Sequence, residues 1–176
     1  MDVDVCEVME VALDMEEQSR QSYVEAAEKA TNPLAKRTFE ALAEWEVEHK
    51  RLLESVRSQA EATQSCPLLS ELNPQDLEIM QAAEQIFKSA LEDLKGELAP
   101  DASLDDAYAA AMAKERKAIE FYRARLEETI DANEQDLYGF LLGQEREHLS
   151  LLATTEEYLN DTKYWHFKQE MWMATG

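Results

Sequence analysis

The chain has 176 residues, which is enough for one domain with a sizeable core. Hydrophobic residues make up 45% of it, and glycine and proline occupy only four positions each, so the composition favours helices over a turn-rich β fold. The formal charge of −21 argues against nucleic acid or anionic lipid as a partner and suits metal cations. No segment has the apolar length of a membrane span, and the N-terminus lacks a signal-peptide pattern, so we expect a cytoplasmic protein.

The first half of the chain is predicted to form a helical hairpin. Its first helix covers residues 5–30. Asn32 and Pro33 then supply an N-cap and a proline in the first turn of a second helix, which reaches about Glu61. A polar break follows, so the hairpin ends there.

The middle of the chain is predicted to connect this hairpin to a second one. The connection, residues 62–104, carries a shorter helix over residues 75–98, where apolar residues recur at three- and four-residue steps. Ser103 and Asp106 then resemble a capping box for a long helix over residues 104–130.

The last predicted helix begins at Asn133, with Asp136 in its first turn, and runs to about Leu159. The four long helices thus form two hairpins. We predict an all-α fold, a four-helix bundle over residues 1–160, followed by an aromatic C-terminal tail over residues 161–176.

The two predicted hairpins repeat each other with an offset of 99 residues. Four of the seven pairs that keep this offset are polar or ionisable, which is unusual for a purely structural repeat. The sequence therefore indicates a duplicated hairpin that carries a duplicated chemical site. The seven pairs are Glu16 and Glu115, Tyr23 and Tyr122, Leu42 and Leu141, Glu46 and Glu145, His49 and His148, Leu52 and Leu151, and Leu53 and Leu152.

Two Glu-x-x-His motifs lie at equivalent positions of the repeat, Glu46 with His49 and Glu145 with His148. Residues three apart share one face of a helix, so a carboxylate and an imidazole there can converge on one metal ion. One such motif occurs by chance in an acidic helix. Here, however, the two motifs contain two of the three histidines, and each follows a glutamate on the partner helix by 30 residues. This pattern is typical of a di-metal carboxylate bundle.

Apolar residues surround the predicted ligands on every helix, which places these ligands in the core. A buried, unpaired carboxylate costs several kcal/mol, so four of them together predict bound cations. The surrounding apolar residues are Val8, Leu13 and Val24 on the first helix, Phe39, Leu42, Leu53 and Val56 on the second, Met112, Ile119 and Leu126 on the third, and Leu137, Leu141, Leu142, Leu149 and Leu152 on the fourth.

The predicted metal ligands are four carboxylates and two imidazoles, without a thiolate. This donor set suits two iron ions, with manganese or zinc as alternatives. The competing interpretation places these glutamates and histidines on solvated faces. The six predicted ligands are Glu16, Glu46, His49, Glu115, Glu145 and His148.

Tyr23 and Tyr122 each follow a predicted ligand glutamate by seven residues, on the same helix face. We expect each hydroxyl to bond a ligand glutamate of the other hairpin and to tune or protect the site, against the alternative of simple core packing. The neighbouring acids are expected to face solvent. These acids are Glu17, Glu44, Glu48, Glu120 and Glu147.

Four segments of the chain resemble the diiron domain of the rubrerythrin branch of the ferritin-like superfamily. They are residues 15–23, 42–49, 115–122 and 145–148, and the similarity extends over residues 5–159. The resemblance implies a ferritin-like bundle with a non-haem diiron centre that reacts with peroxide or O2. It also implies that Glu46 and Glu145 bridge the metals, while Glu16 and Glu115 are terminal ligands.

The sequence departs from the rubrerythrin pattern in two respects. It contains no Cys-x-x-Cys, so the cysteine ligands of a rubredoxin domain are missing and electrons are expected from a separate partner. Ala118 also stands where the family often has a further glutamate, three residues after the third-helix ligand. Both departures resemble the short, rubredoxin-less proteins of this branch.

The remaining features concern the thiols and the tail. Cys6 and Cys66 have neither metal-site nor redox-motif spacing, so we expect reduced thiols, with a disulfide between them as the alternative. The aromatic tail is expected either to dock on its own bundle or to form a subunit interface, and His166 within it is not expected to bind metal. The family resemblance implies a homodimer, with exchange of helices between chains as one form.

Three functions remain open from the sequence alone. The first is an oxidoreductase of the peroxidase or ferroxidase type, which would act on peroxide or O2 and on ferrous iron. The second is a non-enzymatic protein that holds or delivers iron. The third is a metal-free helical adaptor that acts through its tail.

Overall fold

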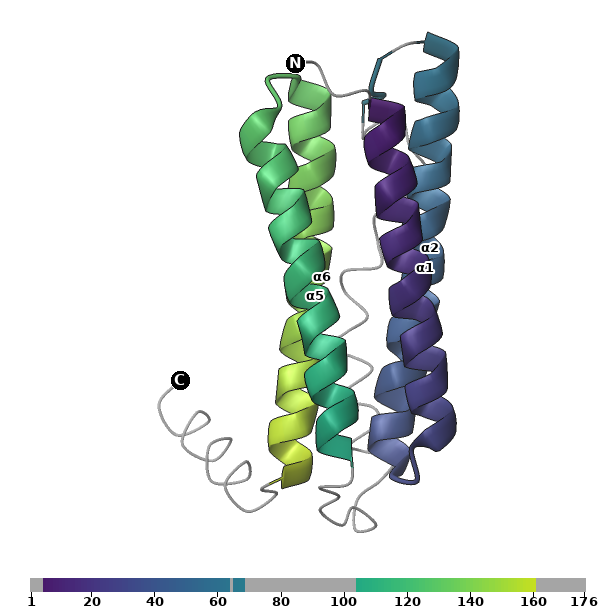
Figure 1. The fold of residues 1–176 in the computed structure, drawn as a ribbon, viewed down its shortest axis with the longest axis vertical. Helices are drawn as coiled ribbons and strands as arrows, with labels where there is room; N and C mark the ends of the chain where they lie inside the picture. Colours follow the sequence, from purple (N-terminus) through teal and green to yellow (C-terminus); the bar gives the residue numbers. More distant parts are fainter. Residues whose placement is uncertain (1–4, 64, 69–103, 161–176) are drawn as a thin grey trace, which may run out of the picture.

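The computed structural model describes residues 5–63, 65–68 and 104–160, and its long helices form an all-α four-helix bundle (Figure 1). All four predicted long helices are confirmed. Within the described ranges, no helix combines the length and the apolar character that a membrane crossing requires. The helices are α1 (Val5–Lys29), α2 (Pro33–Thr63), α5 (Asp105–Glu128) and α6 (Ala132–Asn160).

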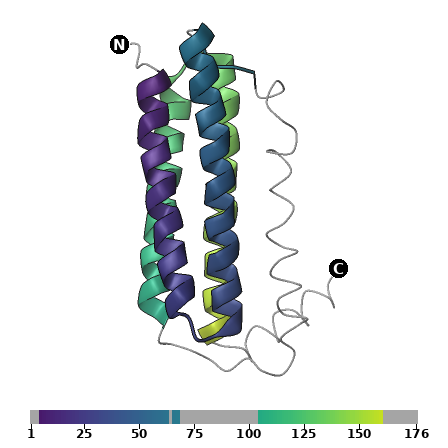
Figure 2. The same ribbon diagram turned by 90° about the vertical axis from the view of Figure 1, so that its right-hand side faces the viewer.

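The bundle consists of two antiparallel hairpins, α1 with α2 and α5 with α6, which are joined by residues 30–32 and 129–131. In both ribbon views α1 lies beside α5 and α2 lies beside α6 (Figures 1 and 2). The end of α2 and the start of α5 lie at opposite ends of the bundle (Figure 1). The shorter helix predicted over residues 75–98 and the tail over residues 161–176 lie outside the described residues.

Both hairpin loops end in a side chain that caps the next helix. The Oδ1 of Asn32 accepts hydrogen bonds from the backbone N–H of Leu34 at 2.9 Å and of Ala35 at 3.3 Å, which confirms the predicted cap of α2. The prediction that Asn133 starts and caps α6 was wrong. Asp131 is the cap, because its Oδ1 accepts hydrogen bonds from the backbone N–H of Asn133 at 2.9 Å and of Glu134 at 3.1 Å. Asn32 and Asp131 are themselves 99 residues apart, so the repeat includes its caps.

The amide of Asn133 has a different role from the predicted cap. Its Nδ2 donates to the backbone carbonyl of Cys66 at 2.9 Å and thereby ties the chain after α2 to the start of α6. The thiol of Cys66 is free and buried, and burial together with the charges of Glu134 and Asp131 raises its pKa to about 12. Cys66 is therefore a free thiol, as its spacing predicts, whereas the side chain of Cys6 lies outside the described residues.

The start of α5 differs from the predicted capping box. The helix begins at Asp105, with Leu104 in the N-cap position and no side-chain cap bond. Asp105 and Asp106 lie in the first turn, where their negative charge favours the positive end of the helix dipole. Ser103, the predicted cap, lies outside the described residues.

Two apolar clusters fill the bundle, one toward each end. The first includes Phe39, which packs between Tyr23 and Tyr108 with ring centroids 6.3 and 4.8 Å apart. The second gathers Val8, Leu53, Val56, Leu137 and Leu141 with their neighbours. Most of the predicted core is thus confirmed. Val24, however, is 37% exposed and lies on the outer side of α1, so the prediction that it belongs to the core was wrong.

Candidate metal centre

The six predicted ligands lie between the two apolar clusters, in the middle of the four helices. α1 contributes Glu16, α5 contributes Glu115, and the two Glu-x-x-His motifs come from α2 and α6. None of the six is more than 2% exposed. The alternative of solvated surface side chains is therefore wrong.

Each histidine ring faces three carboxylates. His49 Nδ1 lies 3.5 Å from Glu16 Oε2, 3.4 Å from Glu46 Oε2 and 3.4 Å from Glu145 Oε1. The ring of His148 has the equivalent surroundings in the other hairpin. Its Nδ1 lies 3.6 Å from Glu46 Oε1, 3.5 Å from Glu115 Oε2 and 3.6 Å from Glu145 Oε2.

The carboxylates therefore fall into two kinds. Glu46 and Glu145 each direct one oxygen toward His49 and the other toward His148. Glu16 approaches only His49, and Glu115 approaches only His148. This arrangement provides two neighbouring positions for a cation. Each position has one histidine and one carboxylate of its own, and both positions share the carboxylates of Glu46 and Glu145.

The buried donor atoms of the centre have no hydrogen-bond partner among the described residues. They are both ring nitrogens of His49 and His148, both oxygens of Glu46 and Glu115, and Oε1 of Glu145. Buried polar atoms almost always have hydrogen-bond partners. A cluster of this many unpartnered atoms therefore requires another explanation. The ligand atoms of Glu46, His49, Glu145 and His148 lie within 4.8 Å of one another and could hold a metal ion. Metal cations would satisfy the carboxylate oxygens and one ring nitrogen of each histidine.

The pKa values of the centre follow from its burial and crowding. Burial, assisted by the charge of Glu16, raises the pKa of Glu46 and of Glu115 to about 8. Burial and the charges of Glu16 and Glu115 raise the pKa of Glu145 well above its usual range. Burial also acts to raise the pKa of Glu16, but its contacts with Glu46 and His49 outweigh that effect and lower it to about 2. Without cations, most of these carboxyls would therefore hold protons near neutral pH.

The two tyrosines of the repeat differ in their contacts. Tyr122 on α5 donates a hydrogen bond to Glu16 Oε1 on α1, as predicted from the sequence. The hydroxyl of Tyr23 is buried but has no hydrogen-bond partner within the described part of the chain, so the equivalent bond to Glu115 is not formed. The prediction is therefore confirmed for one hairpin and wrong for the other.

We expect Tyr122→Phe to lower the free energy of unfolding by about 1–3 kcal/mol, because it removes a buried hydrogen bond to a carboxylate. Tyr23→Phe is expected to be near neutral, because its hydroxyl has no such bond to lose. Urea denaturation of the metal-free variants measures both effects. Equal losses of unfolding free energy in the two variants would contradict the difference between the contacts of Tyr122 and Tyr23.

Trp45 is a feature of the centre that the motif search did not identify. Its indole ring stacks on the imidazole of His148, with ring centroids 5.2 Å apart and planes inclined by 18°. His148 in turn stacks on His49, with centroids 5.0 Å apart. The repeat offset takes Trp45 to Gln144, which is also buried, but the two residue types differ, so the sequence repeat gives no signal for this pair.

The five neighbouring acids have the accessible positions that were predicted. Glu44, Glu120 and Glu147 are exposed. Glu17 and Glu48 are partly exposed, and each pairs with a basic residue of its surroundings. The acids beside the centre thus belong to the surface of the bundle.

A comparison with protein-family models matches residues 7–156 to Rubrerythrin. No curated protein and no solved structure gives a significant match. The match covers α2 and α5 completely and most of α1 and α6, and it includes all six residues of the centre. A ferritin-like diiron domain accounts for the two equivalent positions and for the bundle that holds them. The chain therefore belongs to the rubrerythrin family.

Proposed function

We propose that this protein is a non-haem diiron-carboxylate oxidoreductase that reacts with hydrogen peroxide or O2. The observation that carries the proposal is the position of Glu46 and Glu145, whose two oxygens each face a different histidine. Carboxylates in this position suit a pair of metal ions better than a single one. Carboxylate and imidazole donors without thiolate favour iron over softer metals.

The same geometry supports an assignment of each ligand. Glu16 and His49 would hold one ion, Glu115 and His148 would hold the other, and Glu46 and Glu145 would bridge the two. Four carboxylates would leave two divalent ions close to neutral, which offsets the cost of burying them. The bound irons would supply two electrons to the oxidant.

Three further residues would support this chemistry without binding metal. Tyr122 would hold Glu16 in place through its hydrogen bond and could donate that proton toward the centre. Trp45 would fix the plane of the His148 ring by stacking. Tyr23 would pack against Phe39 and exclude water from that end of the centre.

A second candidate is a protein that binds iron without turning it over. The buried Ala118 favours it, because this side chain adds no carboxylate beside the centre that could take up a shifting ion. The large excess of acidic residues would attract cations to either kind of protein.

Metal analysis followed by stopped-flow mixing tests the proposal. We expect about two irons per chain in protein purified without chelator, and less than about one in Glu46→Ala. The anaerobic ferrous protein should then oxidise on mixing with peroxide or O2 faster than free ferrous iron does. Metal binding without faster oxidation would favour the second candidate, and the absence of bound metal would overturn both.

A further inference from the structure

A cleft between α1 and α5 has Glu16, one of the six residues of the centre, in its lining. It has a volume of about 540 Å³. Met15 and Phe121 form part of its apolar wall, and Glu16 is the one residue of the six that lines it. Because Glu16 also approaches His49 at 3.5 Å, a molecule in this cleft lies one side chain away from the centre.

Small residues line the α1–α5 face of the centre, whereas larger residues cover its α2–α6 face. Ser19 on α1 and Ala118 on α5 both line the cleft, and they are 99 residues apart, so they occupy equivalent positions of the two hairpins. On α2 and α6 the equivalent pair that neighbours the ligands is Trp45 and Gln144, and both are buried. Trp45 lies flat on His148 and covers the centre from that side.

The mouth of the cleft carries unusual charge for such an acidic protein. Lys114 and Lys117 line it together with one exposed acid, Glu120. Lys114 Nζ donates to the backbone carbonyl of Gln18 at 2.9 Å, and neither lysine forms an ion pair with a described residue. The two ammonium groups therefore keep their charge available for an incoming anion.

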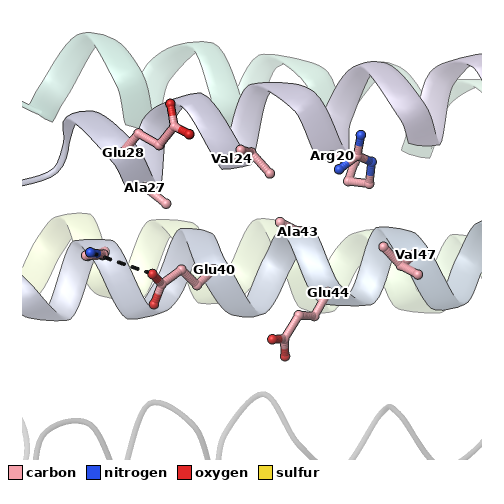
Figure 3. A pocket seen from close by; sticks show the side chains of 9 residues that line it. Arg20, Val24, Ala27, Glu28, Glu40, Ala43, Glu44 and Val47 are labelled. Carbon is pink, nitrogen blue, oxygen red and sulfur yellow. Dashed lines mark ion pairs between the residues drawn. The ribbon is translucent and has the colours of Figure 1, made fainter.

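A second cleft, between α1 and α2, provides an internal comparison (Figure 3). Its volume is about 490 Å³, and none of the six residues of the centre lines it. Glu28, Glu40 and Glu44 outnumber Arg20 and Lys36 there, and Lys36 is occupied by Glu40 at 3.9 Å. Of these two clefts, the α1–α5 cleft is the one lined by a residue of the centre, and its two lysines form no ion pair with a described residue.

We propose that the α1–α5 cleft is the entrance through which small anions reach the metal centre, and that Lys114 and Lys117 attract them. The inference rests on the proposed function, since it requires bound iron. It names the ligand class, small monoanions able to coordinate ferric iron, and it names the face on which they bind. Neutral ligands of the same size would use the cleft without help from the lysines.

Azide binding to the oxidised, iron-loaded protein tests the entrance. Absorption titration and stopped-flow mixing give the affinity and the association rate. Ala118→Leu should fill the base of the cleft and slow azide association at least roughly tenfold. Gln18→Trp, which alters the exposed rim, should act in the same direction and covers the case in which Ala118→Leu does not fold. Val24→Trp, in the other cleft, is the matched control and should leave the rate unchanged.

The double variant Lys114→Gln, Lys117→Gln tests the role of charge. It should weaken azide binding roughly fivefold at low salt, with a smaller effect at high salt. Binding of nitric oxide to the ferrous protein should be slowed by Ala118→Leu but unchanged by the lysine variants. Equal azide rates in wild type, Ala118→Leu and Gln18→Trp would overturn the entrance. Iron content is measured first in every variant, so a chain that binds no iron counts against the proposed function and not against the cleft.

Discussion

Glu145→Gln is expected to raise the stability of the metal-free protein while it removes metal from the centre. Glu145 is 1% exposed, and both of its oxygens point toward histidines, at 3.4 Å from His49 and 3.6 Å from His148. Burial and neighbouring charges raise its pKa well above the usual range, so its carboxylate form is unfavourable without cations. A neutral amide of the same shape removes that cost, and we expect a gain of about 1–3 kcal/mol at pH 8.

Metal binding should respond to Glu145→Gln in the opposite direction. An amide is a weaker, uncharged ligand, so the content should fall from about two ions per chain to below about one. Urea denaturation with chelator measures the stability, and elemental analysis measures the metal. Glu147→Gln is the matched control, because it makes the same change in charge at an exposed position of the same helix. A loss of stability in metal-free Glu145→Gln, or full metal content, would contradict the bridging position.

The sequence was sufficient to predict that the six residues meet in the core, because its information is local and repeated. A Glu-x-x-His pair lies on one helix face whatever the rest of the fold does. The offset of 99 residues then required Glu46 and Glu145, and likewise their histidines, to meet in a symmetric bundle. The burial of all six residues follows from the apolar positions around them, which the helical period already identified.

The features that the sequence did not predict depend on contacts between hairpins or on competing local bonds. Asp131 and Asn133 are both good cap residues, and only the geometry of the loop decides that Asp131 faces the free N–H groups. The difference between Tyr122 and Tyr23 breaks the symmetry of the repeat, so no offset could have shown it. Val24 is apolar and in helical register, yet it lies on the outer side of α1.

The metal-free protein is expected to lose stability as the pH rises from 5.5 to 8, by about 3 kcal/mol. Glu46 and Glu115 have a pKa of about 8 in the folded state, against 4.5 for an ordinary glutamate. Between these values the folded chain holds protons that the unfolded chain releases, so a rise in pH favours unfolding. Each net proton corresponds to about 1.4 kcal/mol per pH unit, so a single net proton over this range already gives a loss of about 3 kcal/mol.

The other ionisable groups of the centre do not reverse this direction. His49 has a pKa raised well above 6.5, since its contacts with Glu145 and Glu16 outweigh burial, so its contribution also declines as the pH rises. Glu16 has a pKa lowered to about 2, and its contribution is present above about 4.5 and is lost only as the pH falls toward 2. Between pH 5.5 and 8, therefore, stability can only fall.

Bound metal should invert this dependence, because the ions require deprotonated carboxylates and bind more tightly as the pH rises. Urea denaturation at pH 5.5 and pH 8, with chelator and with excess manganese, separates the two cases without oxidation chemistry. Glu46→Gln combined with Glu115→Gln should make the curve of the metal-free protein less steep, since the two carboxyls with a pKa of about 8 are gone. A metal-free wild type that is equally stable at both pH values would mean that its buried carboxyls remain ionised. In that case, protonation does not neutralise the carboxylates of the centre before metal binds.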